Sequence, residues 1–313
     1  MLKQILGMTF GLTLTIGTAA SAAEADSCRT VRFSDVGWTD ITSTTAVAST
    51  LLEALGYTPD VSVLSIPVTY TAMKNKQIDV YLGDWQPSME TDRKPFLDDK
   101  SIEVFGPNLT GAKYTFAVPQ YVADAGVRNF SDLQKFGDKF DHKIYGIEPG
   151  NNGNRMILDI IAKGDFGLKG WDLVESSEQG MLSQVERAIN AHEWIVFLGW
   201  APHPMNTRMK IDYLAGGDAY FGPNYGGAAV YTNTRSGYSA ECPNAAKFVT
   251  NLRFTLDMEN QIMNGILNEG KDPKSAAAEW LRAHPETVTP WLDGVTAFDG
   301  KPALDAIKRA LQG

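Results

Sequence analysis

Residues 31–66 of this 313-residue chain read VRFSDVGWTDITSTTAVASTLLEALGYTPDVSVLSI. The first three of these residues predict a β-strand, and residues 41–55 predict a helix because five apolar side chains recur there at helical spacing. The five are Val47, Ala48, Leu51, Leu52 and Leu55. Gly56 and Pro59 end the helix, and residues 61–66 predict the next strand. The stretch therefore reads as a β-α-β unit.

The same alternation continues beyond this unit. A short helix leads to Lys76, and residues 78–82 return to extended structure before the turn-like sequence GDWQP at residues 83–87. Short strands that alternate with amphipathic helices are typical of proteins in which helices pack against sheets. The sequence therefore predicts the α/β fold class.

A second unit of similar kind begins near residue 113. We expect strands at residues 113–118, 143–147 and 195–198, a helix at residues 154–163, and a helix that starts at a capping box from Ser176 to Gln179 and carries Leu182, Val185 and Ile189 on one face. After residue 227 the sequence is mostly helical, and Asp272 with Pro273 marks the start of one helix.

The order of the predicted elements indicates how the domains are organised. Because a helical tail returns after the middle α/β unit, we expect a discontinuous first domain, residues 23–112 with 225–313, and a second domain, residues 113–224. One continuous large domain with a helical appendage is the alternative.

The N-terminal segment resembles an export signal. Lys3 precedes an apolar run at residues 5–16 and a stretch of small residues at 18–23. This pattern predicts a signal peptide, residues 1–22, cut after Ala22, and its apolar run is too short for a permanent membrane span. The mature protein is therefore expected outside the cytoplasm, in the periplasm.

The chain has two cysteines, Cys28 and Cys242. Export would place both where disulfides persist, so we expect them to be bridged, with a reduced and buried pair as the alternative. The three residues before Cys28 lack the pattern of a lipoprotein cleavage site. Since the cysteines lack close-spaced partners and the four histidines are scattered singly, no metal site is expected.

The formal net charge of -9 becomes -10 when the single charge of the leader, Lys3, is removed (-9 - 1). An acidic protein with a pI of about 5.0 is not expected to bind nucleic acid. Its field favours the approach of cations, although ordinary solubility explains the same charge.

Four aromatic residues stand in turn-like contexts beside small or acidic residues. They are Trp38 in GWTD, Trp85 in GDWQP, Tyr114 after GAK, and Trp200 in GWAP. Three of them fall at or just after the end of a predicted strand, which is where open α/β sheets bind ligands. They are therefore candidates for lining a cleft, with packing in the core as the alternative for each. We interpret Trp171, Trp194, Trp280 and Trp291 as structural.

Polar candidates are fewer. Asp40 either caps the helix that follows it or points a carboxylate into the cleft beside Trp38. Residues 148–155, EPGNNGNR, link a strand to a helix and either meet a polar ligand group or form a plain glycine-rich turn. No Gly-x-Ser-x-Gly elbow, His-Glu-x-x-His or clustered Cys and His is present, so no catalytic set is expected. We interpret His203 as structural because no nucleophile neighbours it in sequence.

Five motifs carry a family resemblance: SDVGWTD at residues 34–40, YGIEPGN at 145–151, ESSEQGM at 175–181, FLGWAPHP at 197–204 and FGPNYGG at 221–227. On these motifs the chain closely resembles choline-binding proteins of the glycine betaine and choline ABC importer family. The likeness extends over essentially the whole chain after residue 22. It implies an α/β, type II periplasmic binding protein, with two lobes, each a sheet flanked by helices, that close on a ligand by hinge motion.

The resemblance also implies a site. Trp38, Trp85, Tyr114 and Trp200 would form an aromatic box around a trimethylammonium group, and Asp40 and Asn151 would hold the hydroxyl end of choline. Ring faces suit this ligand because a quaternary ammonium has no N–H to donate. A carboxylate at Asp40 would favour choline and repel the carboxylate of glycine betaine. Asp84 and Asn152 depart from the family pattern, which bears on ligand preference.

The implied function is a non-enzymatic, monomeric receptor without a cofactor, which delivers choline to the permease subunits of an ABC transporter. A receptor for glycine betaine, carnitine or trimethylamine N-oxide is the alternative. Two other classes are kept for comparison: a periplasmic hydrolase of choline esters or sugars that uses Asp40, Asp84 or Glu148, and a sugar receptor that stacks tryptophans on pyranose rings.

Overall fold

The computed structural model describes residues 23–312. The predicted signal peptide, residues 1–22, lies outside the described residues. Within the described range, no helix combines the length and apolar character that crossing a membrane requires.

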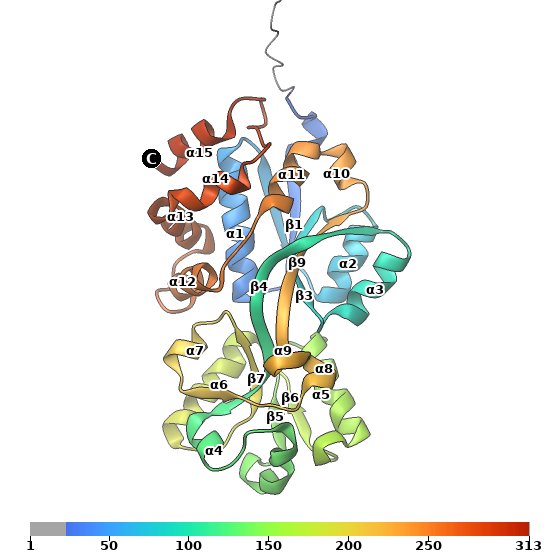
Figure 1. Cartoon of the computed structure of the whole chain (residues 1–313), viewed down its shortest axis with the longest axis vertical. Helices are drawn as coiled ribbons and strands as arrows, with labels where there is room; N and C mark the ends of the chain where they lie inside the picture. The colour runs from blue at the N-terminus through green and yellow to red at the C-terminus, as the bar shows by residue number, and fades with distance from the viewer. Residues whose placement is uncertain (1–22, 313) are drawn as a thin grey trace, which may run out of the picture.

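The elements gather in two lobes that are joined by two long strands (Figure 1). The upper lobe contains β1 (Thr30–Asp35), α1 (Thr39–Ala54), β2 (Thr58–Val63), α2 (Ile66–Lys74), β3 (Val80–Gln86), α3 (Glu90–Asp98), α10 (Tyr238–Glu241), α11 (Pro243–Asn251), α12 (Leu256–Leu267), α13 (Pro273–Ala283), α14 (Val288–Trp291) and α15 (Ala303–Gln312). The C-terminal helices thus lie beside α1, as expected for a tail that returns to the first unit.

The lower lobe is built from the middle of the chain. It contains α4 (Gln120–Asp124), β5 (Lys143–Tyr145), α5 (Asn152–Lys163), β6 (Asp172–Val174), α6 (Glu178–Ala191), β7 (Phe197–Ala201), α7 (Met205–Arg208), β8 (Ile211–Tyr213), α8 (Asp218–Phe221) and α9 (Pro223–Gly226). Four 3-10 segments, η1 (Asp26–Cys28), η2 (Phe130–Phe140), η3 (Asp165–Gly167) and η4 (Pro285–Thr287), complete the element order over the described residues.

Two strands, β4 (Ile102–Pro119) and β9 (Gly227–Arg235), run through both lobes. The strand order is β2-β1-β3-β9-β4-β7-β5-β6, with β8 paired to β4. Strand β4 pairs with β9 up to Lys113, and from Lys113 onward it pairs with β7. The pairing partner therefore changes where the two lobes meet. The predicted domain boundaries at 112/113 and 224/225 stay a prediction.

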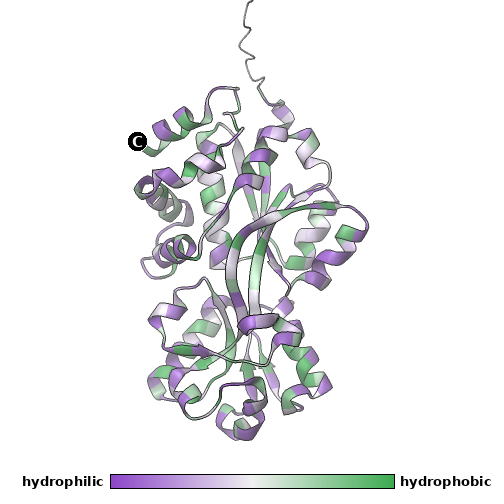
Figure 2. Ribbon diagram, viewed as in Figure 1, coloured by the Kyte–Doolittle hydropathy of each residue, from purple (hydrophilic) through white to green (hydrophobic). Residues whose placement is uncertain are grey.

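Helix α1 shows why the upper lobe is stable. Its residues Val47, Leu51 and Leu52 are completely buried, and the helix packs against α12 and α13. Burial of one such side chain stabilises the fold by about 1.5–3 kcal/mol. Figure 2 shows the same separation of apolar from polar residues in both lobes, with apolar residues along the inner strands and polar residues on the outer faces of the helices.

Two boundaries differ from the sequence-based expectation. Strand β2 spans Thr58–Val63, not residues 61–66, because it pairs in parallel register with all six residues of β1. Ile66 instead begins α2, in which Pro67 occupies the first turn. The predicted turn at residues 83–87 is extended as far as Gln86, because Asp84, Trp85 and Gln86 pair with β9.

Two helix caps were also predicted. The capping box was wrong by one residue, because Ser177, and not Ser176, accepts a hydrogen bond from the amide of Gly180. The cap at Asp272 is confirmed, since its side chain accepts from the amide of Ser275.

A disulfide joins Cys28 to Cys242, as predicted. Both cysteines are buried. Cys28 lies in η1 and Cys242 between α10 and α11, so the bridge ties the start of the described chain to the returning C-terminal part of the upper lobe.

Candidate ligand-binding site

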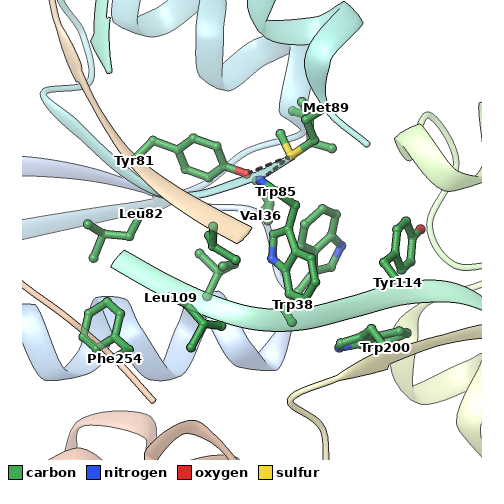
Figure 3. Close-up of a cluster of buried hydrophobic side chains, with 14 of the residues drawn as sticks. Val36, Trp38, Tyr81, Leu82, Trp85, Met89, Leu109, Tyr114, Trp200 and Phe254 are labelled. Carbon is green, nitrogen blue, oxygen red and sulfur yellow. Dashed lines mark hydrogen bonds between the residues drawn. The ribbon is translucent and has the colours of Figure 1, made fainter. Parts of the chain in front are cut away.

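A cavity that is partly open to solvent lies between the two lobes. Its lining residues are Trp38, Asp40, Trp85, Ser88, Tyr114, Ile147, Asn152 and Trp200. The empty space of this cavity, its mouth included, is about 300 Å³. All four aromatic residues singled out in the sequence line it, and Figure 3 shows their rings gathered beside β4.

The rings come from four separate segments. Trp85 lies on β3, Tyr114 on β4 and Trp200 on β7, and Tyr114 and Trp200 are register partners in the sheet. The ring centroid of Tyr114 is 6.3 Å from that of Trp85 and 6.5 Å from that of Trp200, with steep interplanar angles of 61° and 71°. The rings thus stand at angles around a space instead of stacking on one another.

The turn before α1 aims the fourth ring, that of Trp38. Gly37 has a φ of +82°, which favours glycine. The carboxylate of Asp35 accepts from the amide of Gly37 and from the hydroxyl of Thr42, both at 2.7 Å. The indole N–H of Trp38 then donates across the cleft to Oε1 of Glu148 at 2.9 Å. The ring is therefore fixed from both lobes.

Asp40 points into the cavity and does not cap α1. The helix begins at Thr39, two residues earlier than an Asp40 cap requires. Oδ2 of Asp40 accepts from the indole N–H of Trp85 at 3.0 Å, whereas Oδ1 is buried without a hydrogen-bond partner among the described residues. Burial, followed by the charge of Glu178, raises the pKa of Asp40 to about 8.

The two neighbouring asparagines occupy different places. Asn151 caps α5: its Oδ1 accepts from the amide of Gly153 at 2.7 Å and from the hydroxyl of Tyr114 at 3.1 Å, and its Nδ2 donates to Glu148. Asn152 lines the cavity, and neither its Oδ1 nor its Nδ2 has a partner in the described chain. Sequence reasoning chose Asn151 as a ligand contact. In the structure Asn151 accepts from the hydroxyl of Tyr114 and Asn152 lines the cavity wall, while a direct ligand contact of Asn151 stays a prediction.

Gly153 completes this arrangement. A Cβ at this position would lie 1.9 Å from the hydroxyl of Tyr114. Only glycine lets α5 start so close to the ring, so the sequence NNG at residues 151–153 places the cap, the open amide and the phenol together.

Glu178 is the residue that sequence reasoning missed. It lies at the start of α6, is 2% exposed, and contacts Thr39 of the upper lobe. The one signal in the sequence was its place directly after the cap Ser177, which marks a helix start but not the element it faces. Ser88 and Ile147 were also not singled out as lining residues.

Asp84, which departs from the family pattern, does not line the cavity. Its carboxylate is fully buried, accepts from Gln86 and forms an ion pair with Arg93 at 3.1 Å. Burial raises the pKa of Asp84, while the nearby guanidinium of Arg93 lowers it. The charge of Asp84 is therefore matched inside the upper lobe.

No cluster of three or more His, Cys, Asp or Glu side chains suited to a metal occurs in residues 23–312. His203 accepts from the amide of Met205 at Nδ1 and lies 3.1 Å from Glu178 through Nε2. Its ring also packs against that of Trp200, with centroids 5.0 Å apart. Its contacts are those of a side chain that supports the cavity wall.

The fold and the site together define a two-lobe solute-binding protein that encloses a small ligand between its lobes. Comparison with known proteins then gives the family. The model of the substrate binding domain of the ABC-type glycine betaine transport system matches residues 29–283, and the chain belongs to this family.

The chain is similar to a solved ABC-transporter choline binding protein in complex with choline, at 59% identity and a TM-score of 0.90 over 92% of this chain and 100% of that chain. It is also similar to lactococcal OpuAC in its closed-liganded conformation with glycine betaine, at 29% identity and a TM-score of 0.76 over 84% and 98%. An uncharacterized protein, ORF1, of Chromohalobacter salexigens is 52% identical over 134 residues, 43% of this chain and 86% of that protein. The predicted fold class, a two-lobe α/β binding protein, is confirmed.

Proposed function

We propose that this protein captures choline in the periplasm and delivers it to the permease subunits of an ABC importer. The observation that carries this proposal is the cavity that four aromatic rings line together with one buried carboxyl group, whose Oδ1 has no hydrogen-bond partner among residues 23–312. Rings attract a methylated cation by about 0.5–2 kcal/mol each when water is excluded. The similar protein solved with choline supports the same ligand.

The polar end of the cavity favours a hydroxyl group. Oδ1 of Asp40 lacks a donor, and the amide of Asn152 lacks both a donor and an acceptor, within the residues that the structure describes. A hydroxyl both donates and accepts, so it can serve a carboxylate and an amide N–H at once. The proposed contacts are thus Trp38, Asp40, Trp85, Tyr114 and Trp200, with Asn152 at the polar end. Asn151, kept from the sequence prediction, would act through Tyr114.

Ligand capture requires the lobes to open. We propose that residues 23–112 with 225–313 move as one body and residues 113–224 as the other, with β4 and β9 as the connection. The contacts that bridge the cleft fit this division, since Trp38 bonds Glu148 and Asp92 forms an ion pair with Arg155. The protein would act as a monomer, without a cofactor and without catalysis.

Glycine betaine is the second candidate, because the family model describes a glycine betaine transport system and a similar structure holds that ligand. One feature of the site favours it: with a pKa of about 8, Asp40 is protonated at neutral pH, and a protonated carboxyl can donate to the carboxylate of a betaine.

The test is calorimetric titration of the purified protein with choline, glycine betaine, carnitine, trimethylamine N-oxide and a pyranose sugar. Saturable binding of choline at one site, about tenfold or more tighter than glycine betaine, is the expected result. Tighter binding of a betaine would transfer the proposal to the second candidate, and sugar binding alone would reject both. Incubation with acetylcholine tests catalysis, since the appearance of free choline would show a hydrolase.

A further inference from the structure

Helix α1 begins without a cap from its own sequence. Its N-cap residue is Trp38, whose side chain makes no capping hydrogen bond. The first amides of a helix have no partner within the helix and need an acceptor when they are buried. Here the amide of Thr39 donates to Oε2 of Glu178 at 2.9 Å, and the hydroxyl of Thr39 donates to Oε1 of the same group at 2.6 Å. The cap of α1 therefore comes from the opposite lobe.

His203 completes the shell of this carboxylate. The amide of Met205 donates to Nδ1 of His203 at 2.9 Å, so this nitrogen carries no proton, and the proton of the neutral ring is at Nε2. Nε2 lies 3.1 Å from Oε1 of Glu178 and donates to it. Glu178 thus accepts three hydrogen bonds and donates none, which is the pattern of an ionised carboxylate. All three side chains are at most 4% exposed.

The charge of Glu178 is not matched by a full positive charge. Over the described residues, its ion-pair partner within 4.0 Å is His203, which is neutral in this arrangement. The carboxylate of Glu178 instead faces the N-termini of two helices, α6 and α1 of the other lobe. The partial positive charges of helix N-termini stabilise an anion. Its field reaches the cavity, because it contributes to the raised pKa values of Asp35, Asp40 and Glu148.

The contact lies at the ligand site itself. Thr39 stands between Trp38 and Asp40, and both neighbours line the cavity. When the lobes separate, the amide and hydroxyl of Thr39 and the carboxylate of Glu178 must exchange these hydrogen bonds for water. Closure therefore orders the start of α1 at the moment when Trp38 and Asp40 enclose the ligand.

We propose that Glu178 is a positioning residue for ligand binding: it caps α1 across the cleft, holds Trp38 and Asp40 in the cavity wall, and adds a buried negative charge that favours a cationic ligand. The last part rests on the proposed function, because it takes the ligand to be a quaternary ammonium ion. The capping part holds for any ligand that binds on closure.

The substitution that tests this is Glu178→Gln. Glutamine keeps the shape and removes the charge, but its NH₂ replaces one of the two oxygens. In place of Oε2 it faces the amide of Thr39, and in place of Oε1 it faces both the hydroxyl of Thr39 and the N–H of His203, so at least one donor loses its acceptor. We expect the dissociation constant for choline to rise about tenfold or more, mainly through faster dissociation, because the lost contacts exist only in the closed state. Glu186→Gln is the matched control, since Glu186 lies on the same helix and pairs with Arg208. It should leave the affinity within about twofold.

A double-mutant cycle with Thr39→Val distinguishes the positioning role from a purely structural one. This substitution removes the hydroxyl and keeps the shape. If Glu178 acts through Thr39, the combined loss of affinity is smaller than the product of the two single losses, by about threefold or more. Thr39→Val alone should raise the dissociation rate, which keeps the proposal testable if Glu178→Gln does not fold.

The series starts with the wild-type protein and choline, measured by calorimetry and stopped-flow tryptophan fluorescence. Absence of binding by the wild type would refute the proposed function. If the wild type binds and Glu178→Gln binds within about twofold at an unchanged dissociation rate, or if the two substitutions are simply additive, the positioning role is overturned while the function stands. Weaker binding with coupled effects supports it.

Discussion

The indole N–H of Trp85 lies 3.0 Å from Oδ2 of Asp40, so one wall residue of the aromatic cavity orients the carboxyl group that shares the cavity with it. The other oxygen, Oδ1, is left without a partner in the described residues. Ring and carboxyl thus form one unit. In the proposed complex the ring would face the methyl groups of the ligand, and Oδ1 would contact its polar end.

Asp40→Asn tests this unit. The amide keeps the size and can still accept from Trp85, but it has no charge to offer a cation. We expect choline affinity to fall by about 10- to 100-fold, the equivalent of one hydrogen bond to a charged group. Glycine betaine should lose less, because the new amide N–H can donate to its carboxylate as a protonated Asp40 would. Calorimetry with both ligands gives the ratio, and an unchanged ratio would exclude Asp40 as the selective group.

The pH dependence follows from the raised pKa of Asp40, about 8. Burial is its first cause and the charge of Glu178 its second. Glu259 on α12 is a further acidic neighbour, and burial, followed by the charge of Asp40, raises its own pKa. At pH 7 Asp40 therefore keeps its proton, whereas a bound cation would favour the carboxylate. Proton and choline compete, so choline affinity should rise with pH and level off above about 8.

Calorimetry in two buffers of different ionisation enthalpy counts the protons. We expect release of up to about one proton per choline at pH 7, and none in Asp40→Asn. Glycine betaine should show the reverse trend, since its carboxylate is received by the protonated form. Choline binding that is independent of pH from 6 to 9 in the wild type would contradict the assignment.

The aromatic box is tested by Trp200→Ala and Trp85→Ala. Each removes a ring face worth about 0.5–2 kcal/mol of cation attraction, together with apolar contact area, so affinity should drop about tenfold or more. Trp280→Ala is the control, because Trp280 stacks on His284 and bonds Gln261, outside the cavity. Unchanged affinity in both cavity variants would reject the box.

Much of this site could be predicted from the sequence, because the signals are the residues that directly neighbour each tryptophan. A tryptophan at a strand end beside glycine or proline is poorly placed to pack within its own element, so Trp85 and Trp200 indicated a cleft. The family resemblance then predicted that these two rings meet those of Trp38 and Tyr114 in one site. The position of the helical tail beside α1 was expected from the order of elements, because the apolar face of a sheet needs helices to cover it.

What the sequence could not give were contacts between segments distant along the chain. Whether Asn151 or Asn152 faces the cavity depends on where α5 begins, and one residue along a helix turns a side chain by about 100°. Glu178 faces a helix start more than a hundred residues away, and nothing local in ESSEQGM indicates it. The end of β2 was misjudged because its length is set by pairing with β1.

The two asparagines make a matched pair for mutation. Asn152→Ala removes a buried amide that has no partner in the described chain, so the free energy of unfolding should hold or rise while choline affinity falls about 3- to 10-fold. Asn151→Ala removes the cap of α5 and releases the hydroxyl of Tyr114, so unfolding should become easier by about 0.5–2 kcal/mol. Urea unfolding and calorimetry separate the two effects. Equal loss of stability in both variants would show that Asn152 has a structural role.

The disulfide should stabilise the fold without affecting the site. Cys28 and Cys242 are 214 residues apart in sequence, both lie in the upper lobe, and neither lines the cavity. In the chain-entropy treatment, closing so long a loop lowers the entropy of the unfolded chain by an amount worth up to about 5 kcal/mol. Cys28→Ser/Cys242→Ser should therefore unfold at lower urea concentration yet bind choline within about twofold of the wild type.

Reducing agent should shift the unfolding midpoint of the wild type to that of the variant and leave the midpoint of the variant unchanged. Two free thiols in mass spectrometry of the unreduced protein would contradict the bridge, and a large loss of affinity in the folded variant would show that it also shapes the cavity.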